Sequence, residues 1–338
     1  MRAPLLPAVI AFALWATACA GTTTPRVAPG PPPAWPRPPA AARLIFERSL
    51  PDPDRPDQRS GFRRVVDAIL GLEPGAGEPV LVRPFGVAAL PGAVYVADPD
   101  APGVLRADLA SGAFEPVRCR DGEWGAPMAV TIGPGGVVYV ADAGLAVVVR
   151  IAPDGRCDRW GSGTLERPTA LALLGERLYV ADPPRHQVVA YDASGAEVLR
   201  FGARGDGDAG FNFPTGLAAA PDGTLLVIDA LNYKVKRFGP DGTLLSSFGE
   251  AGDDGGRFSR PKAVAVDAAG RIYVTDTQRG LVLAFEADGR FIYAAGGIGD
   301  GPGQLSMPAG VAIAGDLLVV ADGQHRRVET YRFTGDRP

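Results

Sequence analysis

Six aspartates recur at a nearly constant place in the sequence, each at the end of a run rich in β-branched and aromatic residues. They are Asp98, Asp142, Asp182, Asp229, Asp276 and Asp322. A ring of six carboxylates could bind a metal ion or perform acid–base chemistry. Because each aspartate ends a strand pattern, its side chain is better placed to accept hydrogen bonds from the backbone of the following turn. We therefore interpret the ring as structural.

The segments after these aspartates hold most of the polar side chains that could contact a ligand. The candidate binding residues are Arg185, His186, Asn232, Tyr233, Lys234, Arg279, His325, Arg326 and Arg327. Binding residues concentrate on loops that a rigid scaffold holds in place. The pattern predicts a recognition surface of mixed charge on the third to sixth repeats, with ordinary solvated loops as the alternative.

A second set of loops is rich in glycine and aspartate and offers weak candidates for a metal site. These candidates are Asp206, Asp208, Asp253 and Asp254. Calcium needs six to eight oxygen ligands, and the spacing of Asp206 and Asp208 supplies only part of one coordination shell. The distal glutamate of an EF-hand loop does not follow. We expect no resident metal and no cofactor.

A repeat of roughly 45 residues must position all of these side chains. Its six units open at Pro84, Pro127, Pro168, Pro214, Pro261 and Pro308. An aspartate follows each proline after fourteen or fifteen residues, and a valine follows six residues later. Tight Asp-Gly turns, such as Asp241-Gly242, separate short β-rich runs. About four strands fit into one unit, so the sequence predicts an all-β, six-bladed β-propeller with four antiparallel strands per blade.

Residues 84–333 resemble the NHL-repeat family, whose units combine a Pro-x-Gly-Val-Ala-Val-Asp opening with a later Asp-x-x-Asn segment. The fourth unit matches the later part with Asp229, Asn232 and Lys234, and the fifth matches the opening with Ala265-Val266-Asp267. The first two units lack the asparagine and arginine after their aspartates. The resemblance implies a six-bladed propeller of the exported bacterial type.

An enzyme is the alternative function, because propellers of related build include lyases with histidine-bound zinc and lactonases with calcium in the channel. The chain has only two histidines, His186 and His325, at different distances from the preceding aspartates. A three-histidine zinc site therefore cannot be assembled from histidine alone. The segments that open each blade should line the axis, and they are small and apolar, as in Leu217-Ala218-Ala219. We expect a non-catalytic binding or scaffold module rather than a metal-dependent lyase or lactonase-like enzyme.

The sixth repeat ends near Phe333 after only three strands, which leaves its blade without an outer strand. Residues 44–50 carry a strand pattern outside the repeat, and we predict that this segment pairs with the last blade and protects its edge. Between that strand and the first blade, residues 60–71 show apolar residues at helical spacing. Ser60 is a candidate N-cap and Gly71 a stop, so one short helix is expected there.

The start of the chain reads as a signal peptide over residues 1–18, with an apolar stretch too short to span a membrane comfortably. Ala16-Thr17-Ala18-Cys19 resembles the bacterial lipobox, which implies a diacylglycerol on Cys19, and Ala20 after it implies the outer membrane. An ordinary cleaved signal peptide is the alternative. The proline-rich residues 19–43 predict an extended tether, and residues 44–335 the propeller.

The charge balance limits the classes of partner. The net charge is -4 and the pI about 5.4, which argues against a broad surface for nucleic acid. We expect a monomer in the bacterial cell envelope that touches the membrane through its lipid anchor alone. Its partner is then a protein, a peptide or an envelope polymer.

Two further cysteines, Cys119 and Cys157, lie in neighbouring repeats. An exported protein can form disulfides. Alignment of the turns, however, places Cys119 late and Cys157 early in the outer strands of their blades, toward opposite faces. Since bridged Cα atoms lie within about 7 Å of each other, this alignment predicts that the two cysteines do not pair.

Overall fold

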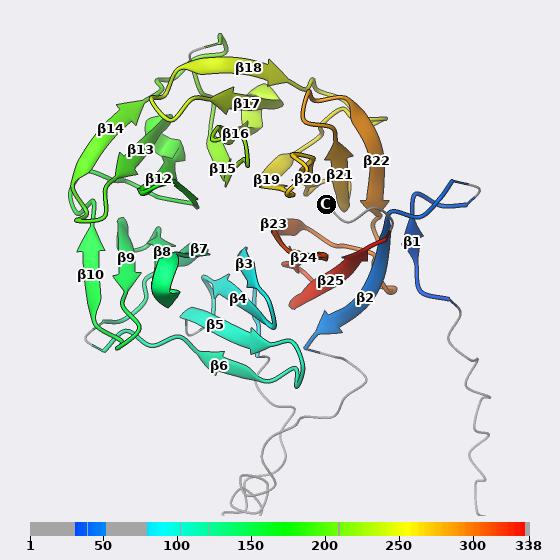
Figure 1. Cartoon of the computed structure of the whole chain (residues 1–338), viewed down its shortest axis with the longest axis horizontal. Coiled ribbons are helices and arrows are strands. Elements are labelled where there is room, and N and C mark those ends of the chain that lie inside the picture. The colour runs from blue at the N-terminus through cyan, green and yellow to red at the C-terminus, as the bar shows by residue number, and fades with distance from the viewer. Residues whose placement is uncertain are drawn as a thin grey trace, which may run out of the picture. The chain divides into compact units, whose positions relative to one another are not determined.

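The strands form six sheets that are arranged in a ring around a central axis (Figure 1). The structure is a computed structural model that describes residues 31–38, 40–51, 80–101, 103–120, 122–208 and 210–334. Five sheets have four strands and one has five, so the predicted six-bladed all-β propeller is confirmed. The predicted signal peptide, Cys19 and the helix over residues 60–71 lie outside the described residues. Within the described ranges, no helix is both long and apolar enough to cross a membrane.

In blades 1 to 5 the chain enters at the innermost strand and proceeds outward, and blade 6 follows the same order for its three inner strands (Figure 1). Blade 1 has β3 (Gly86–Leu90), β4 (Ala93–Asp98), β5 (Gly103–Asp108) and β6 (Phe114–Pro116). Blade 2 has β7 (Pro127–Ile132), β8 (Val138–Asp142), β9 (Val147–Ile151) and β10 (Cys157–Trp160). Blade 3 has β11 (Ala170–Leu174), β12 (Arg177–Asp182), β13 (Gln187–Tyr191) and β14 (Glu197–Phe201).

The second half of the ring continues in the same order. Blade 4 has β15 (Pro214–Ala219), β16 (Leu225–Asp229), β17 (Lys234–Phe238) and β18 (Leu244–Phe248). Blade 5 has β19 (Pro261–Val266), β20 (Ile272–Asp276), β21 (Leu281–Phe285) and β22 (Phe291–Gly296). Blade 6 has β23 (Pro308–Ala314), β24 (Leu317–Asp322), β25 (Arg327–Phe333), β2 (Leu44–Leu50) and β1 (Ala34–Trp35). Three short 3-10 helices are η1 (Pro134–Gly136), η2 (Pro183–Arg185) and η3 (Ala230–Asn232).

The second strand of each blade is almost entirely buried. Every residue of β8, β16 and β20 is buried, because neighbouring blades cover both faces of the sheet. Strands covered on both sides read as continuous apolar runs rather than as an alternation, and the Leu225–Asp229 run is an example. Outer strands such as β14 are largely exposed.

The innermost strands approach one another so closely that small residues are required. A Cβ atom at Gly216 would lie 2.9 Å from the backbone of Ala263 in the next blade. Gly310 donates a hydrogen bond of 2.7 Å from its amide to the carbonyl of Phe85, which joins the last blade to the first. These contacts bring the six innermost strands together around the axis.

The segment Leu44–Leu50 lies beside the last blade, where β2 pairs antiparallel with β25. Beyond it, Ala34–Trp35 pairs with β2 as a fifth strand. The indole of Trp35 is buried and its ring lies 5.8 Å from that of Tyr331. The tether predicted over residues 19–43 is therefore too long at its C-terminal end, because burial of Trp35 attaches that part to the propeller.

Cys119 and Cys157 form a disulfide, with their Cα atoms 5.7 Å apart. The prediction that they do not pair is wrong. It assumed that Cys119 continues an outer strand of blade 1, whereas β6 ends at Pro116. The chain after Pro116 reaches blade 2, where the amide of Arg120 donates to the carbonyl of Gly155. The bond therefore ties the connection after β6 to the start of β10.

Candidate functional site

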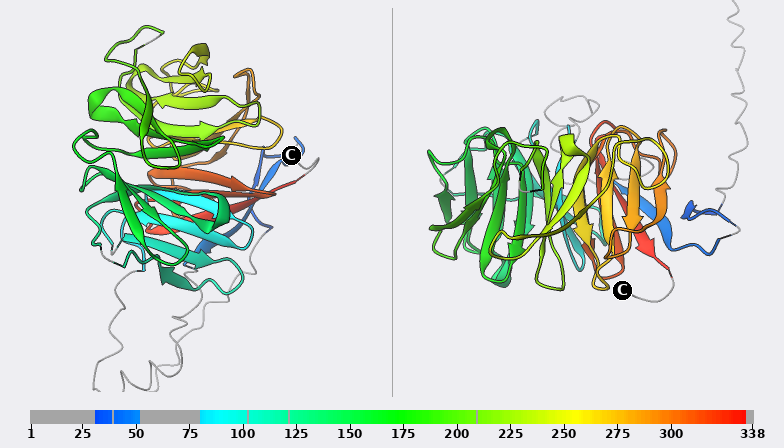
Figure 2. Two further views of the ribbon diagram at one scale, coloured as in Figure 1. Left: turned by 60° about the vertical axis from the view of Figure 1, so that its left-hand side comes forward. Right: turned by 90° about the horizontal axis from the view of Figure 1, so that it is seen from above.

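The six repeated aspartates mark one face of the propeller, which we call the aspartate face. The strands run from one face of the ring to the other (Figure 2), and each aspartate ends the second strand of its blade. All six are fully buried. Each carboxylate accepts at least one backbone amide from the segment that enters its own blade. Bonds to the following turn, the expected role, are made by Asp98, Asp142 and Asp276.

These hydrogen bonds give the aspartates a structural function that extends beyond the turn that follows each of them. Asp142, for example, accepts the amides of Gly125 and Ala126 at 2.8 Å each. It thereby joins the segment that enters blade 2 to the turn that follows β8. Because buried polar groups are costly when unpaired, the aspartates hold both sets of loops in fixed positions.

The predicted binding residues of blades 3, 4 and 5 lie on this face and largely bond to other parts of it. Asn232 donates to the carbonyl of Gly205 at 2.9 Å and to Asp229 at 2.7 Å. Lys234 donates to the carbonyl of Gly249, and Arg279 to that of Arg257. Arg185 pairs with Glu166 at 3.5 Å. Two others have left-handed backbones, His186 at φ 53° and Tyr233 at φ 56°.

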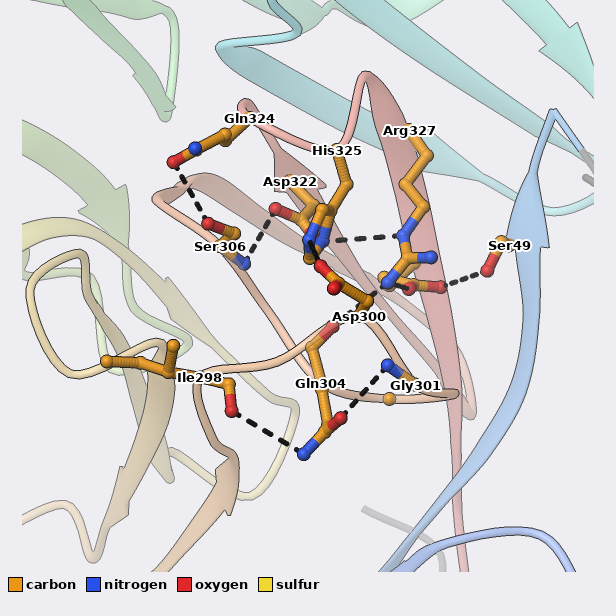
Figure 3. Close-up of polar contacts among 12 residues, drawn as sticks. Ser49, Ile298, Asp300, Gly301, Gln304, Ser306, Asp322, Gln324, His325 and Arg327 are labelled. Atoms are coloured by element: carbon orange, nitrogen blue, oxygen red, sulfur yellow. Dashed lines mark hydrogen bonds and ion pairs between the residues drawn. The ribbon is translucent and has the colours of Figure 1, made fainter.

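Two of the three predicted residues of blade 6, His325 and Arg327, belong to a polar cluster (Figure 3). Its other members are Ser49, Asp300, Asp322 and Glu329. His325 lies between two carboxylates, with Nδ1 at 2.6 Å from Asp322 and Nε2 at 2.8 Å from Asp300. Arg327 pairs with the buried Glu329 at 2.7 Å. Ser49 of β2 donates to the same Glu329 carboxyl at 2.7 Å.

Burial raises the pKa of Glu329 to about 7, although Ser49 and Arg327 oppose the shift. Burial also raises the pKa of Asp322, against the hydrogen bond from His325. Arg326, between the two paired residues, has a left-handed backbone at φ 57°. Through the bond between Ser49 and Glu329, the cluster joins β2 to β25. We call this junction the seam of the ring, and the polar groups of the cluster stabilise it.

The acidic loops are not arranged as calcium sites, because basic side chains of the protein contact them. In the loop that contains Asp206 and Asp208, the ammonium of Lys236 donates to the carbonyls of Gly207 at 2.9 Å and Gly210 at 2.6 Å. A cation of the chain itself therefore occupies the inner side of this loop. In the equivalent loop of the next blade, Asp254 lies 3.3 Å from Arg257, and Asp253 is exposed. Among the described residues, no three His, Cys, Asp or Glu side chains gather in a way that could hold a metal ion.

A different group of side chains surrounds the mouth of the channel on the aspartate face. We call the residue before each repeated proline the rim position. Around the ring it holds Arg83, Ala126, Arg167, Phe213, Arg260 and Met307. Arginines thus occupy blades 1, 3 and 5, and a small or bulky apolar residue occupies each blade between them.

The backbone separates the two bulky apolar rim residues from the other four. The amides of Arg83, Ala126, Arg167 and Arg260 donate to the aspartates of their blades. Phe213 and Met307 instead have left-handed backbones, at φ 68° and φ 61°. Their side chains are 41% and 52% exposed. Bulky residues rarely adopt this conformation, and such strain is concentrated at functional sites.

We call the residue after each repeated proline the channel position, because in every blade except the second it lines the central cavity. It holds Phe85, Met128, Thr169, Thr215, Lys262 and Ala309. The ammonium of Lys262 lies 4.6 Å from the centre of the Phe85 ring. Burial, together with the positive charges of Arg260 and Arg167, lowers the pKa of Lys262 to about 8.

Lys262 is the charged residue that sequence reasoning missed at this site. The channel was expected to be small and apolar, and most of its lining fits that expectation. The missed signal was positional, because two threonines and one lysine occupy the same place in an otherwise apolar segment. The sequence also carries a positional signal for the three rim arginines, because each stands directly before a repeated proline.

A family model described as "6-bladed beta-propeller" matches residues 257–337. No curated protein sequence matches the chain. Among solved structures, the chain is similar to a virginiamycin B lyase from Staphylococcus aureus, with 16% identity, 77% of this chain and 83% of that chain covered, and a TM-score of 0.55.

Two further similar structures differ in their described activities. One is a gluconolactonase from Xanthomonas campestris, with 17% identity, 76% and 88% of the two chains covered, and a TM-score of 0.59. The other is an auxiliary nutrient binding protein from Bacteroides thetaiotaomicron, with 12% identity, 75% and 70% covered, and a TM-score of 0.59. At these identities the similarity shows the fold, which serves both catalysis and binding.

Proposed function

We propose that this propeller is an exported, non-catalytic binding module of the bacterial cell envelope, attached to the outer membrane through a lipid on Cys19. The bound partner is a protein, a peptide or an envelope polymer, and it docks on the aspartate face. The propeller fixes the positions of the loops, and the loops supply the contacts. The resemblance of 84–333 to NHL repeats and the lipobox-like segment before Cys19 support this proposal.

The observation that carries the proposal is the composition of the rim. Three arginines alternate with apolar residues, and two bulky side chains, Phe213 and Met307, are exposed on strained backbone. Exposed aromatic residues and arginines are enriched where proteins bind partners. A partner that fits this rim has both apolar surface and negative charge.

Site-specific photo-cross-linking in whole cells tests the proposal. A benzophenone amino acid at position 213 should give a defined adduct that mass spectrometry identifies. The matched control carries the same group at Leu245 of the outer strand β18, which is 55% exposed. The same adducts at both positions, or none at position 213, would overturn the proposed docking face.

The lipid anchor has its own test. Metabolic labelling with a radioactive or clickable fatty acid should mark the wild-type protein, and Cys19→Ser should remove both the label and the membrane association. Retention of the label in the Cys19→Ser variant would contradict the anchor and leave the docking face untouched.

The alternative function is a metal-dependent lyase or lactonase-like enzyme at the channel mouth, which the lyase and the gluconolactonase among the similar structures favour. Elemental analysis of the purified full-length protein separates the two. A stoichiometric zinc or calcium ion, together with turnover of a small ester or peptide, would favour the enzyme over the binding module.

A further inference from the structure

The channel mouth contains two polar groups for which the described residues offer no polar partner. No hydrogen bond or ion pair to a described side chain engages the Lys262 ammonium, whose neighbour is the ring of Phe85. The hydroxyl of Thr169 is buried and has no hydrogen-bond partner among the described residues. By contrast, the hydroxyl of Thr215 donates to the backbone carbonyl of Lys262 at 2.8 Å.

Both unpartnered groups line one cavity. It has a volume of about 60 Å³ and is enclosed by the innermost strands of all six blades. Lys262 is the one charged residue among those that line it. A partly buried cation without a counter-charge is costly, and here the surroundings add Arg167 and Arg260 rather than a carboxylate.

The size of the cavity limits what can enter. A bound water needs roughly 10–15 Å³ of such space, so about 60 Å³ admits a group of a few heavy atoms. A whole sugar ring is too large for this space. A carboxylate or a phosphate group fits, and its negative charge matches the ammonium.

We propose that the channel position forms a socket for one terminal oxyanion of the docked ligand, bound by the ammonium of Lys262 and the hydroxyl of Thr169. This inference rests on the proposed function, because it names the chemical group with which a partner on the aspartate face enters the channel. At the rim, Arg167 and Arg260 attract the anion, and Phe213 and Met307 contact the apolar part of the same ligand.

The lysine content of the chain makes the socket testable at one residue. The chain has three lysines, Lys234, Lys236 and Lys262. The ammonium groups of the first two donate to backbone carbonyls. Acylation of each lysine by acetic anhydride, measured by mass spectrometry between pH 6 and 10, therefore reports on Lys262 with two internal controls.

In the full-length protein, acylation of Lys262 should have its midpoint near pH 8. Acetate or inorganic phosphate, compared with sodium chloride at equal ionic strength, should raise this midpoint and slow acylation at pH 8 about threefold or more, because a bound anion favours the charged lysine. Protection by acetate identifies a carboxylate, and protection by phosphate identifies a phosphoryl group. Either result supports the socket.

Two variants remove the socket in different ways. Thr169→Val preserves side-chain shape and should reduce the anion protection about threefold. Arg260→Met should also weaken it, whereas Arg290→Met removes the same charge at the turn before β22, on the opposite face, and should leave it unchanged.

Equal acylation of Lys262 in either anion and in sodium chloride would overturn the socket, and so would full protection in the Thr169→Val variant. Neither result changes the photo-cross-link expected at position 213. Loss of that cross-link with anion protection intact would instead overturn the docking face.

Discussion

The polar cluster of blade 6 and the channel mouth lie on the same face but satisfy their charges differently. In the cluster, His325 contacts two carboxylates, and Arg327 pairs with Glu329. At the mouth, Lys262 faces an aromatic ring and two arginines. The first region uses its polar groups to hold the seam together. The second retains an unpaired charge, which is the property expected of a site that awaits a ligand.

The largest effect should come from breaking a satisfied pair. Lys236 and Asp229 are both buried and lie 3.1 Å apart, so Asp229→Ala leaves a buried cation without its partner. We expect a loss of about 3–5 kcal/mol in the free energy of unfolding, measured by urea denaturation. The exposed pair of Glu250 and Arg257 is the control, with 2.8 Å between the two side chains, and Glu250→Ala should cost less than about 1 kcal/mol. Similar losses for both would contradict the comparison.

The second effect is a pH dependence of the free energy of unfolding, which we expect from Glu329 at the seam. The pKa of Glu329 is raised to about 7 in the folded protein from an ordinary value of 4.5. The folded state therefore binds more protons between these values, and its stability should fall as the pH rises from about 4.5 to 7. Glu329→Gln should remove on the order of 2 kcal/mol of that fall. Thermal unfolding at pH 5 and pH 7.5 measures it, and parallel curves for both proteins would refute it.

A smaller effect of opposite sign is expected at the mouth. Lys262→Met replaces an unpaired, partly buried charge by an apolar chain and should stabilise the protein by about 1 kcal/mol at pH 7. Because the pKa of Lys262 is lowered to about 8, the unfolded chain binds more protons above that pH. Wild-type stability should therefore rise relative to the variant between about pH 8 and 10.5. Destabilisation by Lys262→Met would show that the lysine is structural.

The smallest effect tests the strained rim. Phe213 has φ 68°, a conformation that glycine adopts without cost, so Phe213→Gly should stabilise the fold by up to about 1 kcal/mol. In the extended strand β14, Val198→Gly should instead destabilise it by roughly 0.5–1 kcal/mol. Differential scanning calorimetry compares the two. Equal destabilisation by both substitutions would show that the backbone at Phe213 carries no strain.

Much of the fold could be predicted from the sequence because the repeat is visible in it. Six prolines and six aspartates in phase determine the number of blades, and the turns between them determine the strands. The pairing of Cys119 with Cys157 could not be predicted, because it depends on where the chain leaves β6. The strand at Ala34–Trp35 was hidden by the prolines around it.

The site was harder to predict because residue type does not reveal which polar groups have partners. Asn232 and Lys234 look available in the sequence, yet both donate to backbone carbonyls of neighbouring loops. Lys262 stands in an otherwise apolar segment, and its residue type alone does not mark it as a binding residue. Its role depends on convergence of the six innermost strands, and that convergence is a property of the assembled ring.

The pairing of β2 with β25 also determines when the ring of blades can close during synthesis of the chain. Ser49 and Glu329, which bond across this seam, are 280 residues apart in the chain. The strand β2 is thus synthesised before the six repeats, and its partner β25 is synthesised at their end. Until then both edges are open to wrong pairing, and contacts this distant in sequence form slowly. A ribosome or an export channel must therefore release all six repeats before the ring can close.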